Sequence, residues 1–363
     1  MIEADWIRAA RILAVRLDNL GDVLLTTPAL HAIKHARPRI HLALWTSTVG
    51  AQVARLDPDI DEVIVRDVPW IDPWRRLERS PARELAAIAD LHARGFDAAI
   101  VFTSFRQSPL PAAYACYLAD IPLRLGATWD GAGSLLTTRH RAPESTDVHE
   151  VERALDLVAQ VGFAAREREL VLSVPDDARR DARALLQALA PRGPAIVVHP
   201  GCTMPARTYP EELFASVVDA LVLRLGATVF VTGTTEERAL VDRVCGGVSS
   251  NARRRVYPLA GALSFELFAG LLAAADVVVT NNTGPMHVSA AVGTPVVALF
   301  ALTNPPQQWR PWGVEHRLLN RDVPCKFCYA RVCPYAQECL RGVPPDEVVD
   351  AAAELMGATA RAA

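Results

Sequence analysis

Short runs of β-branched and aliphatic residues alternate with amphipathic stretches of helical period along most of this 363-residue chain. Strands of near-continuous Val, Ile and Leu are what a parallel sheet covered on both faces requires. The alternation therefore predicts parallel α/β winding. The expected strands are Arg11–Leu17, His41–Thr46, Glu62–Asp67, Asp97–Phe102, Ala195–Pro200, Thr228–Gly233, Asp276–Asn281 and Pro295–Phe300. The expected helices are Asp22–Ala36, Ala82–Ala93, Val148–Val161, Asp176–Ala190, Pro210–Leu225, Ser264–Ala274 and Asp346–Met356.

The pattern starts a second time at Ala195, after a joint rich in helix-breaking residues at Pro191–Pro194. The chain is long for one domain and suits two. We predict an N-terminal Rossmann-like domain over 1–175 and a C-terminal one over 176–363. Each would be a doubly wound parallel sheet that binds ligands at the carboxyl ends of its strands, and the two sheets would face a cleft.

Charge and hydropathy exclude several classes of protein. The formal net charge is -3, which gives no overall field for nucleic acid. The opening MIEADWIRAARILAV has acidic residues before a short apolar run, unlike a secretory signal. No apolar stretch approaches the roughly 18 residues that span a bilayer. We expect a cytoplasmic protein with at most peripheral membrane contact.

The first candidate site follows the first strand, in RILAVRLDNLGDV. Gly21 would allow a tight turn and close approach of a ligand to the backbone. Asp22 would lie at the mouth of the cleft, where a carboxylate accepts a proton from a hydroxyl group. The alternative is that Asp22 is only the N-cap of the helix, which Asp favours.

Two further segments suggest an anion site in the second half. HPGCTMPARTYP places Arg207 after a strand and a glycine loop, and a guanidinium with backbone amides suits a diphosphate. NNTGPMHVSAAVG delivers Asn282, Thr283 and Gly284 to a helix N-terminus, with His287 one turn in. The alternatives are a solvated arginine and a histidine packed in the core.

These segments resemble, in order and spacing, the blocks of the heptosyltransferase family of glycosyltransferases (family 9). The blocks are RILAVRLDNLGDVLLTTPAL, HPGCTMPARTYPEE, TGTTEERAL and NNTGPMHVSAAVGTPVVALF, and the resemblance covers Arg11 to Trp312. It implies a GT-B fold and inverting, metal-independent transfer of a sugar. The family includes the ADP-heptose:lipopolysaccharide enzymes, so the resemblance favours ADP-heptose as donor and a glycan or glycolipid as acceptor.

The resemblance also implies roles for single residues. Asp22 matches the catalytic base, and Arg207 falls at the basic position that contacts the diphosphate. Thr283 and Gly284 match the diphosphate-binding turn, and His287 the histidine beside it. The family often has Asp where this chain has Asn282, which leaves open how the donor sugar is held.

Two positions are expected at the nucleoside. Glu236 or Glu237 resembles an acidic position that binds the ribose, and the sequence does not decide between them. Leu263 falls where a nonpolar residue borders the base. For the acceptor we expect walls from two loops, 68–81 with Trp70 and Trp74, and 104–111. Aromatic faces suit sugar rings, although the two tryptophans would serve equally well as packing.

Four cysteines form C-x2-C-x4-C-x5-C at Cys325, Cys328, Cys333 and Cys339. Four thiolates suit a structural Zn²⁺ or iron ion, and some relatives in the resembled family bind iron through cysteines. The alternative is a set of reduced structural cysteines. A metal here would order a loop and would leave the nucleotide site, which is expected on other loops, untouched. No cofactor is expected for transfer itself.

We predict a glycosyltransferase that moves a sugar from a nucleotide-diphosphate donor. A nucleotide-sugar epimerase or hydrolase of the same fold would need the diphosphate cradle but not a base at Asp22. An inactive nucleotide-sugar-binding protein would be consistent with Asn282 but not with the retained Asp22, Arg207 and His287.

Overall fold

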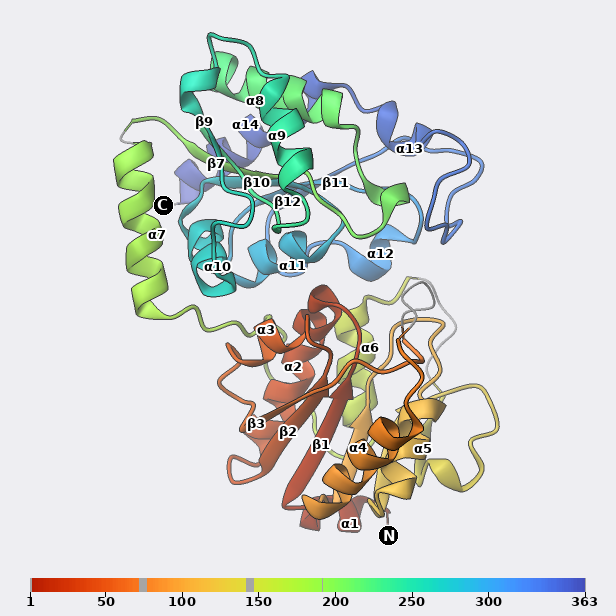
Figure 1. The fold of residues 1–363 in the computed structure, drawn as a ribbon. Helices are drawn as coiled ribbons and strands as arrows, with labels where there is room; N and C mark the ends of the chain where they lie inside the picture. The colour runs from red at the N-terminus through yellow and green to blue at the C-terminus, as the bar shows by residue number, and fades with distance from the viewer. Residues whose placement is uncertain (1, 72–76, 142–146, 191, 363) are drawn as a thin grey trace. The chain divides into compact units, whose positions relative to one another are not determined.

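The computed structural model describes residues 2–71, 77–141, 147–190 and 192–362. The chain divides into two compact units, Met1–Ser173 and Val174–Ala363 (Figure 1). Trp74, one of the expected acceptor residues, lies outside the described residues. Within them, no helix is long and apolar enough to cross a membrane.

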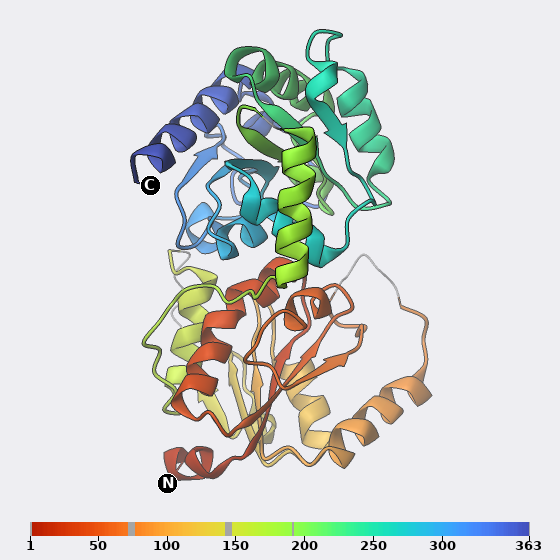
Figure 2. The same cartoon turned by 90° about the vertical axis from the view of Figure 1, so that its left-hand side faces the viewer.

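Unit 1 is a six-stranded parallel sheet in the order β3-β2-β1-β4-β5-β6. Its strands are β1 (Arg11–Arg16), β2 (His41–Thr46), β3 (Glu62–Val65), β4 (Ala98–Val101), β5 (Leu123–Ala127) and β6 (Thr138–His140). Its helices are α1 (Ile2–Arg8), α2 (Leu20–Ala36), α3 (Ala51–Ala54), α4 (Pro81–Ala93), α5 (Leu110–Leu118) and α6 (Glu150–Ala159). Helices α2 and α6 pack on one face and α4 and α5 on the other (Figure 2).

Helix α2 contains a proline and remains one helix. Pro28 has no N–H, so it cannot donate to the carbonyl of Leu24. The hydroxyl of Thr27 donates to that carbonyl instead, at 2.7 Å. The same hydroxyl accepts from the backbone N–H of Val171 at 2.9 Å, which ties the end of unit 1 to α2.

Unit 2 repeats this topology, in the order β12-β11-β10-β7-β8-β9. Its strands are β7 (Ala195–His199), β8 (Thr228–Val231), β9 (Val256–Pro258), β10 (Val277–Asn281), β11 (Val296–Leu299) and β12 (His316–Leu319). Its helices are α7 (Asp176–Leu189), α8 (Glu211–Leu225), α9 (Arg238–Gly246), α10 (Phe265–Ala274), α11 (Gly284–Ala291), α12 (Pro306–Trp309), α13 (Glu338–Arg341) and α14 (Pro345–Ala362).

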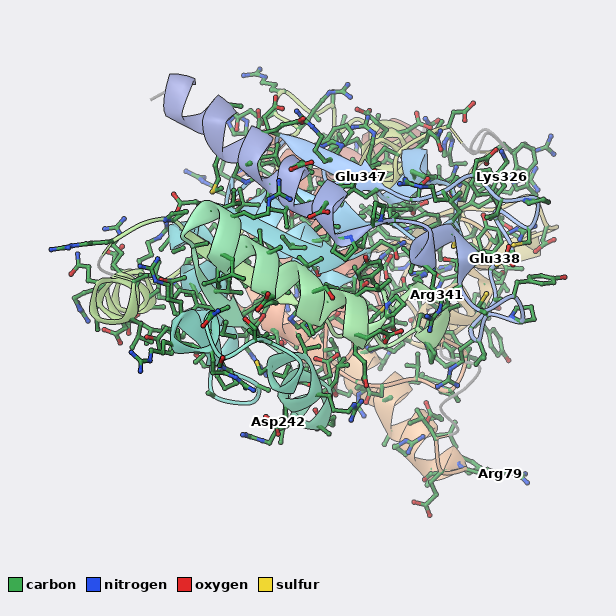
Figure 3. The ribbon with its side chains drawn as sticks, turned by 90° about the horizontal axis from the view of Figure 1, so that it is seen from above. Arg79, Asp242, Lys326, Glu338, Arg341 and Glu347 are labelled. Carbon is green, nitrogen blue, oxygen red and sulfur yellow. The ribbon has the colours of Figure 1, made fainter. Side chains whose placement is uncertain are left out.

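The large core of unit 2 lies between the sheet and the helices α8, α9 and α14. Figure 3 shows α8 and α14 side by side over the strands. Helix α7 packs on α10 outside the sheet. Two doubly wound parallel sheets confirm the predicted fold class. In each unit the strand order reverses between two neighbouring strands, and ligands bind beyond the carboxyl ends of the strands at such a point.

Candidate active site

In unit 1 the strand order reverses between β1 and β4. The segment after β1 leads into α2, whose third residue is Asp22, and the segment after β4 carries Ser104. The Ser104 hydroxyl donates to Asp22 Oδ1 at 3.0 Å, so the two segments meet at this point.

Asp22 is not the N-cap of α2, because that position belongs to Asn19. Its carboxylate accepts from Arg16 Nη2 at 3.2 Å as well as from Ser104, and its side chain is 16% exposed. It is therefore held in place yet open to a ligand, and the interpretation as a cap is wrong. Gly21 is buried in the first helical turn and is not among the glycines with positive φ, so a left-handed turn is not the reason for glycine there.

Arg16 is the centre of a buried charge network that sequence reasoning missed. The Arg16 side chain is 3% exposed, and its Nε lies 3.2 Å from Asp18 Oδ2. Burial by itself lowers the pKa of Arg16, but the carboxylates of Asp18, Asp22 and Glu150 outweigh it and the pKa is raised. One guanidinium thus faces three carboxylates.

Two of these carboxyl groups are themselves perturbed. Burial raises the pKa of Asp18 to about 6, against the opposing effect of Arg16. Burial raises the pKa of Glu150 to about 7, against Arg16 and Arg153. Glu150 also accepts from the backbone N–H of Phe105 at 3.3 Å, which links α6 to the loop after β4.

A pocket of about 380 Å³ opens beside this network. The segments 102–108 and 127–130 line it together with Arg16 and Thr26 from the β1–α2 region and residues of α6. Arg153 lies over the ring of Phe105, 5.2 Å from its centroid. The expected acceptor loop 104–111 thus forms part of a pocket. Trp70 does not line it, because its ring packs edge-on against Trp45 at 6.3 Å.

In unit 2 the strand order reverses between β7 and β10. Asn281, the last residue of β10, makes hydrogen bonds to the loop that follows β7. Its side-chain oxygen accepts from the backbone N–H of Tyr209 at 2.9 Å, and its amide donates to the carbonyl of Pro200 at 2.8 Å. The loop after β7 and the turn that carries Arg207 are therefore fixed to the end of β10.

The N-terminus of α11 follows β10 directly. Thr283 is its N-cap and makes no side-chain capping bond, and Gly284 is the first helical residue. Burial raises the pKa of the nearby Cys202 thiol, against the combined effects of the Met204 N–H, Arg207 and a hydrogen bond with Thr283. Arg207 and Thr283 therefore both lie near the Cys202 thiol. His287 is 5% exposed.

Arg207 is not a freely solvated side chain. Its Nε donates to Thr303 Oγ1 at 2.9 Å, and Thr303 Oγ1 donates to Asn304 Oδ1 at 3.0 Å. Asn282 Nδ2 donates to the same Asn304 oxygen at 3.2 Å. A buried polar network that sequence reasoning missed therefore joins Arg207 to the turn before α11.

The structure separates the two candidate ribose residues. Glu236 is exposed, whereas Glu237 turns toward the ends of β7 and β8. Its carboxylate accepts from the N–H of Thr234 at 2.8 Å and lies 3.6 Å from His199 Nε2. A Cβ on Gly201 would overlap the same carboxylate, so a larger residue there would displace the Glu237 side chain. Leu263 is half-buried in the loop before α10.

The segment 325–339, here called the Cys-rich segment, holds four free cysteines, of which Cys328 is exposed and the other three are half-buried. Burial, and then the other three thiols, raise the pKa of Cys339. The N–H groups of Tyr335 and Gln337 donate to Cys333 Sγ at 3.4 and 3.3 Å. Even so, no three His, Cys, Asp or Glu side chains of the described residues are arranged to hold a metal ion. Four thiols remain a donor set that suits Zn²⁺ or iron.

The Cys-rich segment is not isolated from the turn that carries Arg207. The backbone N–H of Ala206, next to Arg207, donates to the carbonyl of Arg331 at 2.8 Å. The Cys-rich segment is thus bonded to the turn that carries Arg207. Figure 3 labels two residues of this segment, Lys326 and Glu338, and Arg341 just beyond it. All three lie on the right-hand side of that view.

Two doubly wound parallel units, each with polar side chains at its reversal point, have the architecture of the GT-B fold. Residues 85–338 match the model of glycosyltransferase family 9 (heptosyltransferase), and the chain belongs to that family. It is a glycosyltransferase of the heptosyltransferase type.

Individual proteins are similar to this chain over most of its length. Lipopolysaccharide heptosyltransferase 1 of Pseudomonas aeruginosa is 29% identical over 332 residues, which is 90% of this chain and 88% of that protein. The solved family 9 glycosyltransferase of Veillonella parvula has a TM-score of 0.79 at 22% identity, covering 96% of this chain and 98% of that one. An E. coli heptosyltransferase solved with ADP-2-deoxy-2-fluoro heptose has a TM-score of 0.66 at 23% identity, covering 95% and 99%.

Proposed function

We propose that this enzyme transfers heptose from ADP-heptose to a hydroxyl group of a glycan or glycolipid, with inversion and without a metal ion. The observation that carries the proposal is the placement of Asp22, oriented by Arg16 and Ser104 beside a pocket of about 380 Å³. The donor is proposed from the relatives, among which one is solved with an ADP-heptose analogue. Unit 1 would bind the acceptor and unit 2 the donor.

Asp22 takes the proton of the acceptor hydroxyl as its oxygen attacks the anomeric carbon. The new carbon–oxygen bond forms on the face opposite the diphosphate, so the configuration inverts. The bond from the anomeric carbon to the diphosphate oxygen breaks, and its electron pair leaves with ADP. The acquired proton then passes from Asp22 to water.

Negative charge grows on the leaving diphosphate during this step. The positive end of α11, which begins at Gly284, and the hydroxyl of Thr283 would stabilise it, together with the guanidinium of Arg207. His287 lies one turn further along the same helix. Glu237 is better placed than Glu236 to accept from the ribose hydroxyls, and Leu263 would border the base.

Asn282 would hold the donor sugar through an uncharged group. Its amide nitrogen is used by Asn304, and its Oδ1 is buried with no hydrogen-bond partner among the described residues. A buried acceptor without a partner is costly, so a hydroxyl of the bound sugar would stabilise it. This favours a binding role for Asn282 and not a loss of activity.

A structural Zn²⁺ or iron ion at Cys325, Cys328, Cys333 and Cys339 stays a prediction, and no step of transfer depends on it. Elemental analysis of protein purified under reducing conditions tests it. Less than a tenth of a metal ion per chain would contradict it.

A panel of labelled nucleotide sugars tests the function. ADP-heptose with a mixture of lipopolysaccharide-derived acceptors should give a labelled acceptor and ADP, whereas UDP-linked sugars should not. Release of free heptose at the same rate with and without acceptor would instead favour the hydrolase alternative. A changed sugar that stays attached to the nucleotide would favour the epimerase.

A further inference from the structure

Hydrogen bonds from the Cys-rich segment hold the turn that carries Arg207 on both sides. Gln337 donates from Nε2 to the carbonyls of Pro205 and Thr208, at 2.6 and 2.9 Å. The carbonyl of Arg331 accepts from Ala206 at 2.8 Å. Three bonds thus fix the four residues that present the guanidinium.

The same segment reaches Arg207 by a second route. The N–H of Tyr329 donates to the carbonyl of Thr303 at 2.8 Å, and the N–H of Phe327 donates to that of Leu302 at 2.6 Å. Thr303 is also the residue whose hydroxyl accepts from Arg207 Nε. The backbone on both sides of Arg207 and the partner of its side chain are therefore bonded to one distant stretch of chain.

Gln337 has a conformation that requires support. Its φ is 61°, in the left-handed region that is unfavourable for a residue other than glycine. Its own N–H is used by Cys333 Sγ. Because both partners of its side chain are carbonyl oxygens, the amide must present its NH₂ group to them. The hydrogen bond to Cys333 therefore fixes the backbone of Gln337, and the side chain of Gln337 fixes the turn that carries Arg207.

We propose that Gln337 is a positioning residue of the donor site, through which the Cys-rich segment holds Arg207 ready for the diphosphate. The inference rests on the proposed role of Arg207. A guanidinium held in advance loses less conformational freedom when it binds, so affinity for the charged ligand rises without a new contact. The affinity for a nucleoside without phosphates would not change, because such a ligand does not contact the guanidinium.

Calorimetry with ADP and with adenosine tests this on the full chain. Gln337→Met keeps the length of the side chain but removes both N–H donors. It should weaken ADP binding by roughly three- to tenfold, the scale of one or two net hydrogen bonds, and leave adenosine binding unchanged. In an Arg207→Met background the same substitution should have little further effect on ADP. Thr303→Val, which removes the acceptor of Arg207, should behave like Gln337→Met.

Val332→Ala is the matched control, because Val332 belongs to the same segment and its side chain is 68% exposed. It should bind ADP as the wild type does. Wild-type ADP affinity in Gln337→Met, an equal loss for adenosine, or a full loss on top of Arg207→Met would each overturn this inference alone. Wild-type ADP affinity in Arg207→Met would overturn the proposed function of Arg207 as well.

Discussion

Buried charge around Arg16 determines how Asp22 is presented. A guanidinium with 3% exposure is stable only when its charge is matched, and three carboxylates surround it. Ser104 completes the arrangement, since its hydroxyl accepts from Arg16 at 2.8 Å and donates to Asp22 at 3.0 Å. Each hydrogen bond restricts the rotation of the carboxylate that would take the proton.

Glu150 should make stability depend on pH. Its pKa is raised from 4.5 to about 7, because burial disfavours the charged form. Between these values the folded chain holds a proton that the unfolded chain has released, so the free energy of unfolding falls as pH rises from about 4.5 to about 7. Glu150→Gln, which still accepts from Phe105, should flatten that slope in urea unfolding of unit 1.

Other buried carboxyl groups also titrate between about pH 4.5 and pH 7. The slope of the free energy of unfolding in Glu150→Gln must therefore be compared with the slope in the wild type. Asp57, buried elsewhere in unit 1, also has a pKa raised to about 7 by burial, and that of Asp18 is raised to about 6. These should leave a residual slope in the variant. An identical slope in Glu150→Gln and the wild type would show that Glu150 is ionised throughout.

For single residues, the sequence indicated which residues lie in the loops after the strands, but it did not indicate which distant residues contact them. Asp22, Arg207 and Thr283 lie in the segments that follow strands, where a local pattern predicts candidate site residues. Glu150 lies more than a hundred residues beyond Arg16 in the chain, and only the packing of α6 on α2 brings it near. Thr303 and Asn304 lie in a segment without helical or strand periodicity, so no local sequence pattern indicated a role for them.

Helix α7 depends on a close contact with α10. A Cβ on Gly270 of α10 would lie 2.7 Å from the carbonyl oxygen of Ala178 in α7. Because that atom is backbone, the two helices would have to move apart. Gly270→Ala should lower the free energy of unfolding of unit 2 by about 1–3 kcal/mol, as overpacking does.

Gly246, at the end of α9, gives the matched control. A Cβ there meets nothing within 4 Å, and its φ is not positive. Gly246→Ala should be neutral or stabilise by up to about 1 kcal/mol, through a less flexible unfolded chain. Equal stability of both variants in thermal unfolding would contradict the contact between α7 and α10.

Among the elements, the strongly apolar strands and the long helices were predicted to within a few residues. The strands β5, β6, β9 and β12 were missed. Each is an outer strand of its sheet or next to one, and β6 and β9 have only three residues. Short outer strands bury less than central ones, so they carry a weaker apolar signal. Helix α5 was not predicted, because its residues are apolar on all sides and the sequence therefore shows no helical periodicity of apolar and polar positions.

For the whole molecule, the restart of the strand–helix pattern was the decisive signal. Two copies of one strand order follow from it, and each copy puts its functional loops at its own reversal point. The Cys-rich segment shows the limit of that reasoning. It lies between β12 and α14 in the chain, yet it contacts the loops after β7 and β11.

We propose that Asp22 of unit 1 takes the acceptor proton while unit 2 binds the donor. Asp22→Asn keeps the size of the side chain and its bond from Ser104 but removes the base. The claim predicts that turnover with ADP-heptose falls by about 10²-fold or more, the scale of a lost general base, while ADP affinity by calorimetry stays at the wild-type value. Near-normal turnover in Asp22→Asn, or a loss of ADP affinity that accounts for the loss of rate, would contradict it.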